Sequence, residues 1–290
     1  VTLPAINEGE VLVQNIYMSV DPYMRGRMYD RKSYVTPFQI AQPLEGGCVG
    51  RVIESKNKGF KVGDHVLSML GWREAFVSDG RGLSPVDPEL APLPAYLGVM
   101  GMPGMTAYFG LMDIAKPKAG ETVVVSAAAG AVGSMVGQIA KIKGCRAVGI
   151  AGSEEKCAFV TEELGFDACI NYKTAYFKDR LADACPQGVD IYFENVGGTV
   201  QQAVWPLLNV GARITVCGLI ALYNATELPP GPDRSPLFFI DILVKRLMVN
   251  GFIVLDHAAD FPAMSADLSR WLSEGRIRYR EDVVDGLEDA

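Results

Sequence analysis

The sequence predicts an α/β protein with a β-rich first part and a doubly wound parallel sheet in its second part. Residues 1 to about 100 contain short runs of alternating apolar and polar residues, separated by glycine turns, as in a compact barrel-like β domain. From residue 121 onward, apolar strand-like runs alternate with segments of helix length. That alternation is typical of a parallel sheet with helices on both faces.

The composition narrows the classes of function. A chain of 290 residues with 49 % apolar content can form one large domain or two medium ones. Its net charge of −7 argues against nucleic acid as a partner. The run between Glu121 and Lys141 is uncharged, but Ser, Gly and Gln interrupt it and three valines open it as a strand, so no membrane span is expected.

Cysteine and histidine usage predicts a protein with reduced thiols and no metal. None of the six cysteines forms a C-x-x-C pair, which favours free thiols and a cytoplasmic location over a disulfide framework. Neither His65 nor His257 has a cysteine or second histidine at ligand spacing. We therefore expect no metal site.

The strands and helices expected in each part follow from these periodicities. The first part should contain strands over residues 10–17, 47–55, 66–69 and 72–78, followed by a proline-rich linker between residues 85 and 103. The second part should contain strands near residues 122–126, 146–151, 168–171, 189–194, 212–217 and 247–254, and helices near 106–114, 131–143, 154–164, 176–185, 197–208 and 262–275. Residues 221–234 should form a loop after a strand, and residues 277–279 should begin another strand.

The stretch around residues 123–137 indicates a dinucleotide site. A buried strand, a turn of small residues and a small-residue helix follow one another, with Ala127, Gly130 and Gly133 in the spacing A-x-x-G-x-x-G. The unpaired N–H groups and the dipole of such a helix attract a pyrophosphate, and glycines permit its close approach. The motif departs from G-x-G-x-x-G at its first position and is weak alone. A tightly packed core helix is the alternative.

The second strand of this part favours NADP(H) over NAD(H). NAD-binding sheets end this strand in Asp or Glu, which holds the ribose 2′-hydroxyl. Here residue 151 is followed by Gly152 and Ser153, with no acidic residue at the tip. Ser153 is a suitable N-cap, and Lys156 can reach back toward a 2′-phosphate. Alternatively, Lys156 is only a solvated helix charge.

Several longer motifs carry a resemblance to a known family. They are SVDPYMRG at residues 19–26, GMPGMTAY at 101–108, the turn at 127–133, NYK at 171–173, ENVGG at 194–198 and CGLIALYN at 217–224. Together they resemble the zinc-independent medium-chain reductases of the leukotriene B4 dehydrogenase and prostaglandin reductase group, with the closest likeness to bacterial NADP-dependent curcumin reductases. The match spreads over nearly the whole chain.

The resemblance implies a fold, a reaction and an assembly. It implies a GroES-like β-rich catalytic domain over residues 1–103 with a return segment at 262–290, and a Rossmann NADP-binding domain over residues 104–261. It implies NADPH-dependent reduction of the C=C bond of a hydrophobic α,β-unsaturated ketone or aldehyde, by a homodimer. Zinc-dependent relatives place metal ligands where this chain has Ser19-Val20-Asp21 and Leu44-Glu45, so both ligand positions are lost.

The resemblance also suggests which residues form the site. Tyr223 is expected to polarise the substrate oxygen, because enolate charge develops there as hydride arrives. The ribose hydroxyl of the cofactor is the other candidate donor, and the proton for the α-carbon comes from one of these hydroxyls or from water. The alternative for Tyr223 is a packed loop residue. The expected cofactor contacts are Gly130, Ala131, Val132, Gly133, Ser153, Lys156, Tyr172, Asn195, Cys217, Gly218, Leu219, Ile220, Tyr223, Phe252, Ile253 and Val254. The expected substrate contacts, for each of which packing is the alternative, are Tyr23, Arg25, Trp72 and Tyr108.

Two further readings of the sequence stay open. One is a quinone or allylic-alcohol oxidoreductase on the same scaffold, and the other is an NADPH-binding sensor without turnover. The resemblance also implies that family members continue beyond residue 289 with a helix, a loop and a strand that includes a cofactor-contacting Asn. A chain without that segment should expose a sheet edge and bind NADPH less well.

Overall fold

The computed structural model describes residues 5–227 and 231–290, and the chain divides into two compact units. One unit runs to Gly101 and includes Arg280–Ala290; the other is Met102–Tyr279. The first boundary lies close to the expected one at residue 103, but the expected return at residue 262 requires correction. Helix α8 (Phe261–Ser273) stays with the second unit because it packs against α2 (Met102–Phe109), where Tyr108 donates a 2.9 Å hydrogen bond to Asp267.

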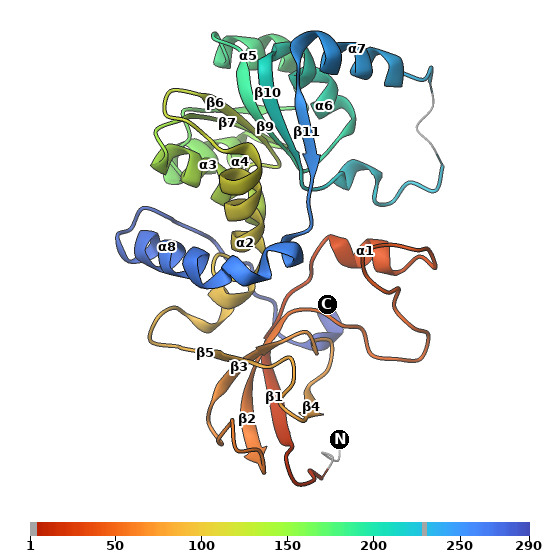
Figure 1. Cartoon of the computed structure of the whole chain (residues 1–290), viewed down its shortest axis with the longest axis vertical. Helices are drawn as coiled ribbons and strands as arrows, with labels where there is room; N and C mark the ends of the chain where they lie inside the picture. Colours follow the sequence, from red (N-terminus) through yellow and green to blue (C-terminus); the bar gives the residue numbers. More distant parts are fainter. Residues whose placement is uncertain (1–4, 228–230) are drawn as a thin grey trace. The chain divides into compact units, whose positions relative to one another are not determined.

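The first unit is built on a five-stranded antiparallel sheet with the order β4-β1-β2-β3-β5 (Figure 1). Its elements are β1 (Val11–Met18), α1 (Tyr23–Arg27), β2 (Cys48–Ser55), β3 (His65–Ser68), β4 (Ala75–Ser78), β5 (Ser84–Val86) and the 3₁₀ turn η1 (Leu93–Leu97). Alternate apolar residues of β1 and β2 turn inward, and Val11, Val13 and Val52 form a core with Phe76.

Two differences from the expected strands have local causes. Strand β4 begins at Ala75 instead of residue 72, because Trp72 has a φ of +59°, which a strand cannot contain. Strand β5 was not predicted, because it lies where the expected proline-rich linker begins, and Pro85 stands at its centre. A proline is tolerated there because β5 lies at the edge of the sheet.

The second unit is built on a six-stranded parallel sheet with the order β11-β10-β9-β6-β7-β8. The strands are β6 (Thr122–Ser126), β7 (Arg146–Ala151), β8 (Ala168–Asn171), β9 (Val189–Glu194), β10 (Leu208–Val216) and β11 (Met248–Gly251). The strand order reverses between β6 and β9. In sheets of this kind ligands bind at the carboxyl ends of the strands beside such a reversal.

Helices cover both faces of this sheet (Figure 1). The second unit contains the helices α2, α3 (Ala131–Ile142), α4 (Glu154–Ala158), α5 (Phe177–Ala184), α6 (Gly198–Val204), α7 (Ser235–Lys245) and α8. Its shorter helical segments are η2 (Gly110–Ala115), η3 (Phe159–Glu163), η4 (Trp205–Leu207), η5 (Ile220–Leu222) and η6 (Val254–Asp260). The short segment η7 (Leu287–Asp289) belongs to the first unit. Val124 packs in the core formed with α5 and α6, and Val123 and Val125 point to the opposite face. Burial on both faces explains the uninterrupted valine run.

Three elements of the second part differ from the sequence-based expectations. Strand β10 begins at Leu208 instead of residue 212, directly after the turn that contains Pro206. Helix α7 was not predicted. Residues 277–279 form no strand, because the Gln138 side chain bonds both the N–H and the C=O of Arg278 in place of a neighbouring strand. Among the described residues no helix combines the length and the apolar character needed to cross a membrane.

Candidate active site

The turn after β6 has the geometry of a pyrophosphate site. Ala127 adopts a φ of +51°, so it takes the left-handed conformation that glycine usually supplies at this position. Gly130 is the N-cap of α3, and no side chain caps the first N–H groups of the helix. A Cβ at Gly133 would lie 2.2 Å from the Ala127 carbonyl oxygen, so only glycine lets the helix start this close to the strand.

Polar groups gather at the tip of β7, where a 2′-phosphate is expected. The Ser153 hydroxyl caps α4 by accepting a 3.2 Å hydrogen bond from the Lys156 N–H, which confirms the predicted cap. The Lys156 side chain is exposed. The Tyr172 ring lies over Gly152, 3.3 Å from the position of a Cβ there.

Lys173 is a second cation at this tip that the sequence reasoning did not single out. Its ammonium lies 5.9 Å from the centre of the Tyr172 ring, and its Cε lies 3.7 Å from the Cβ position of Gly152. The motif NYK contained it, and its position directly after Tyr172 was the available signal. Two lysines and a capped helix start form a donor set that fits a dianionic phosphate.

The tips of β9 and β10 bring Asn195 and the segment after residue 217 together. Cys217 and Gly218 donate their N–H groups to the Glu194 carbonyl oxygen at 2.9 and 3.1 Å. Ile220 donates to the Asn195 carbonyl oxygen at 3.1 Å, and the Leu219 side chain lies against Gly197. The expected cofactor contacts from these two strands therefore share one edge of the sheet.

Tyr223 follows directly after η5, at the same edge. Its hydroxyl lies 2.8 Å from the position that a Cβ at Gly218 would occupy, so the phenol packs against the Gly218 backbone. The ring is half-buried, and no hydrogen bond of its hydroxyl occurs within the part of the chain that the structure describes. The exposed Tyr172 hydroxyl likewise makes no hydrogen bond among these residues, but it lies at the tip of β7, whereas Tyr223 lies at the edge formed by the ends of β9 and β10.

The segment Phe252 to Val254 follows β11. A Cβ at Gly110 would lie 2.8 Å from the Phe252 ring, so this ring packs over the end of α2. Ile253 is half-buried and Val254 is buried at the start of η6. The three residues thus lie after a strand's carboxyl end, as expected.

The expected substrate residues Tyr23, Arg25 and Trp72 lie in the first unit. The Tyr23 hydroxyl and the Trp72 Nε1 are buried and lack a hydrogen-bond partner among the described residues. Burial, together with the Asp21 carboxylate, raises the pKa of Tyr23 to about 12. The Arg25 guanidinium lies 4.7 Å from the centre of the Tyr29 ring. Trp72 also carries the positive φ noted above, and such strain concentrates at functional sites.

Tyr108 lies in the second unit and is engaged within it. Its hydroxyl donates to Asp267, and its ring packs edge-on against Phe109 and tilted against Trp271. Burial and the Asp267 hydrogen bond raise the pKa of Tyr108 to about 12. The phenol therefore holds α2 to α8.

The zinc-ligand positions of metal-dependent relatives hold other interactions here. Ser19 donates a 2.7 Å hydrogen bond to Asp21, whose pKa is raised by burial. Glu45 pairs with the buried Arg27 at 2.7 Å. Within the described residues no three His, Cys, Asp or Glu side chains are grouped so that they could hold a metal ion.

Comparison with known proteins shows the family. Residues 1–86 match the N-terminal domain of oxidoreductases, and residues 131–270 match the zinc-binding dehydrogenase family. The chain is 51 % identical to the NADPH-dependent curcumin reductase of Escherichia coli over 98 % of this chain and 82 % of that protein. It is 45 % identical to rat prostaglandin reductase 1, covering 99 % of this chain and 85 % of the relative. A crystal structure of CurA from Vibrio vulnificus with NADPH matches with 52 % identity and a TM-score of 0.94, covering 99 % and 87 % of the two chains.

The chain therefore belongs to the medium-chain dehydrogenase/reductase family, in the group that includes curcumin and prostaglandin reductases, and it is an NADPH-dependent oxidoreductase. The expected fold class, a GroES-like β-rich part with a Rossmann parallel sheet, is confirmed. The turn at Ala127–Gly133 and the lysines at the β7 tip fit NADPH. At positions 19–21 and 44–45 the chain has neither cysteine nor histidine.

Proposed function

We propose that this enzyme reduces the C=C bond of α,β-unsaturated ketones or aldehydes without a metal ion. The observation that carries the proposal is the Tyr223 phenol, which leans on Gly218 at the sheet edge with its hydroxyl uncommitted among the described residues. The names of the relatives support an enone: curcumin reductase and prostaglandin reductase. Curcumin and 15-oxoprostaglandins are conjugated, largely apolar ketones.

Tyr223 supplies the electrophilic assistance in this mechanism. Bound NADPH provides the hydride that reaches the β-carbon. Negative charge then develops on the substrate oxygen, and a donor aimed at that oxygen stabilises the transition state more than the ground state. The Tyr223 hydroxyl is such a donor. Protonation of the α-carbon completes the reduction, either from Tyr223 or from water.

Tyr23 and Trp72 are proposed to contact the substrate. Each carries a buried donor that lacks a partner among the described residues, and such atoms are costly to leave unpaired. Arg25 and the ring face of Tyr108 complete the proposed set. A tyrosine and a tryptophan suit a conjugated apolar ligand.

Lys156 is proposed to hold the 2′-phosphate of NADPH, with Ser153 at the start of the same helix and Tyr172 near the adenosine. Lys156→Ala should therefore weaken NADPH by about tenfold or more and leave NADH nearly unchanged, since only NADPH carries that phosphate. Lys178→Ala, which removes another exposed lysine of the same unit, is the matched control. Equal losses for NADPH and NADH would remove the assignment. The remaining expected cofactor contacts are part of the same proposal.

We propose a homodimer that associates through an apolar surface on α7 and β11. This α7–β11 surface consists of Leu237, Phe239, Ile240, Leu243, Val244, Met248 and Val249, all exposed. Strand β11 is an edge strand, and all four of its residues are exposed. An exposed apolar edge is a site for pairing, and a second copy can pair with it around a two-fold axis.

Analytical ultracentrifugation tests this assembly. The protein should sediment with about twice the 31.3 kDa mass of one chain. Leu243→Asp should give monomers, because it places a charge on the most exposed side chain of the surface. Leu90→Asp, at an exposed leucine of the first unit, should leave the dimer intact. A monomeric parent protein would contradict the proposal.

Free thiols at all six cysteines accord with the proposed cytoplasmic location.

The deciding experiment is NADPH consumption at 340 nm with a linear enone, curcumin and a quinone, each repeated with NADH. Turnover of an enone with NADPH supports the proposal, and Tyr223→Phe should then lower kcat by about tenfold or more while the NADPH Kd changes little. Faster turnover of the quinone would favour a quinone oxidoreductase. Cofactor binding without any turnover would favour a sensor.

A further inference from the structure

Glu194 is a fully buried carboxyl group at the carboxyl end of β9. Its exposure is 1 %, and no ion pair with it occurs among the described residues. Three donors hold its carboxylate: the Ser126 hydroxyl at 2.9 Å, the Tyr192 hydroxyl at 2.7 Å and the Val196 N–H at 2.7 Å. Burying an ionisable group without a counter-ion is costly, so the fully buried position of this carboxyl group calls for a reason.

The carboxylate links the two strands between which the sheet order reverses. Ser126 ends β6, and besides donating to Glu194 it accepts a 2.7 Å hydrogen bond from the Asn195 N–H. The Asn195 side-chain amide donates to the Ser126 carbonyl oxygen at 2.8 Å. Ser126 immediately precedes the turn that begins at Ala127. The pyrophosphate turn and the end of β9 are thus tied together by one group of hydrogen bonds.

The same residue also anchors the segment that carries Tyr223. The main-chain oxygen of Glu194 accepts the N–H groups of Cys217 and Gly218. The Tyr223 hydroxyl packs against Gly218. A shift of Glu194 would therefore move three parts together: the end of β6, the Asn195 turn and the support of the Tyr223 phenol.

We propose that Glu194 is a positioning residue of the enzyme, whose buried carboxylate sets the spacing of the β6 and β9 ends and through it the NADPH turn and Tyr223. The link to Tyr223 rests on the proposed function; the link to NADPH does not. Glu194 is not proposed to touch the cofactor or the substrate. It acts by holding Ser126 and Asn195 at one fixed separation.

The first test compares NADPH affinity in Glu194→Gln, Ser126→Ala and Tyr192→Phe. The first two variants disturb the link between β6 and β9, and each should raise the NADPH Kd about tenfold. Because they disturb the same link, the double variant should be little worse than either single one. Tyr192→Phe is the comparison variant: its 2.7 Å bond to the carboxylate lies within β9, so its Kd should change less than about threefold.

A merely structural role would give a different result. It would lower the melting temperatures of Glu194→Gln and Tyr192→Phe and raise their NADPH Kd values in proportion. Unchanged NADPH affinity in both Glu194→Gln and Ser126→Ala, or equal losses in Glu194→Gln and Tyr192→Phe, would overturn the proposal. Ser126→Ala keeps the buried carboxyl group and serves if Glu194→Gln does not fold.

The second test addresses Tyr223. If Glu194 positions the phenol, Tyr223→Phe should lower kcat less in the Glu194→Gln background than in the parent protein. Fully independent effects of the two substitutions would overturn this part. A parent protein that reduces no enone would refute the proposed function alone, because the NADPH affinities would still report on Glu194.

Discussion

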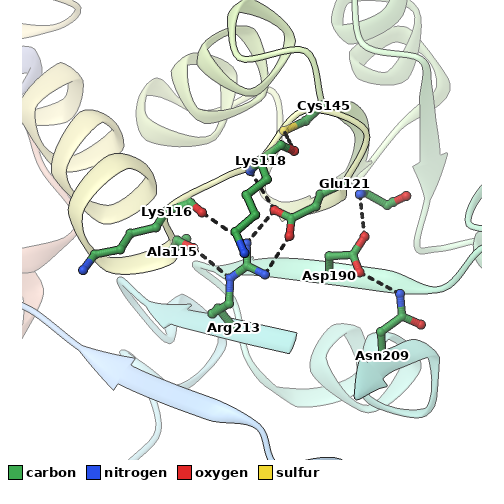
Figure 2. A network of polar contacts seen from close by, with 9 residues as sticks. Ala115, Lys116, Lys118, Glu121, Cys145, Asp190, Asn209 and Arg213 are labelled. Atoms are coloured by element: carbon green, nitrogen blue, oxygen red, sulfur yellow. Dashed lines mark hydrogen bonds and ion pairs between the residues drawn. The ribbon is translucent and has the colours of Figure 1, made fainter. Parts of the chain in front are cut away.

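Replacing Arg213 by Ala should destabilise the second unit strongly while leaving its cofactor site intact. Arg213, on β10, forms two hydrogen bonds with the Glu121 carboxylate, one of them 2.9 Å long (Figure 2). It also donates to the carbonyl oxygens of Ala115 and Lys116, at 2.8 and 3.3 Å. Those two oxygens end η2, so one guanidinium joins the start of β6, the middle of β10 and the end of a helical turn.

The size of the effect follows from the burial of this pair. Only 14 % of the Arg213 side chain and 18 % of the Glu121 side chain are exposed, so water replaces the lost bonds poorly. Removing one partner of a buried ion pair lowers the free energy of unfolding by about 3–5 kcal/mol. Because this pair is partly exposed, we expect a loss of about 3 kcal/mol. Total domain stabilities are about 5–15 kcal/mol, so the loss should be large.

The pH dependence of the loss has a defined sign. Burial acts to raise the pKa of Glu121, but the Arg213 hydrogen bonds and the Lys118 N–H outweigh it, so the pKa lies below its usual 4.5. A lowered carboxyl pKa stabilises the folded protein above the unfolded pKa, and this contribution disappears as the pH falls through the folded value. The difference in the free energy of unfolding between the parent protein and Arg213→Ala should therefore be largest at pH 7 and should shrink below about pH 4.5.

Urea unfolding at pH 7 measures the effect, and hydrogen exchange in β6 and β10 assigns it to the second unit. Arg276→Ala is the control, because the Arg276–Glu274 pair is 3.4 Å long and about half exposed, so it should change stability by less than about 0.5 kcal/mol. NADPH affinity should stay unchanged, since Glu121 precedes β6 and the cofactor turn follows it. A loss below about 1 kcal/mol for Arg213→Ala would refute the reasoning.

Two further predictions concern the cofactor turn and the thiols. Gly133→Ala should raise the NADPH Kd by at least about tenfold, because its Cβ would lie 2.2 Å from the Ala127 carbonyl oxygen. Gly251→Ala is the control, because among the described residues no heavy atom beyond its chain neighbours lies within 4 Å of the Cβ position there. Titration of NADPH fluorescence compares the two variants, and equal affinities would contradict the packing argument. Cys217 is half-buried, and burial together with the Glu194 charge raises its pKa to about 12. It should therefore react with iodoacetamide at pH 8 far more slowly in the folded protein than in urea. Mass spectrometry follows the alkylation, and a rate equal to that of a free thiol would contradict the raised pKa.

The sequence by itself determined the local features of the second part. A valine run, small residues at Ala127, Gly130 and Gly133 and a helix-length segment are adjacent along the chain, so strand, turn and helix could be predicted from local preferences. The absence of an acidic residue before Ser153 favoured NADPH over NADH in the same way. Long shared motifs extended these predictions to the family and to Tyr223.

Only the tertiary structure decided how distant residues combine. Ser126 and Glu194 are 68 positions apart, and Arg213 and Glu121 are 92 apart. Tyr108 was expected either to contact the substrate or to pack, and the partner that its hydroxyl meets, Asp267, is 159 positions away. Such pairs depend on strand order and helix packing, because no local periodicity encodes which distant side chain a buried polar group will meet. The assembled sheet therefore decides where the proposed catalytic and positioning groups lie, while the turn at residues 127–133 is a property of one continuous segment.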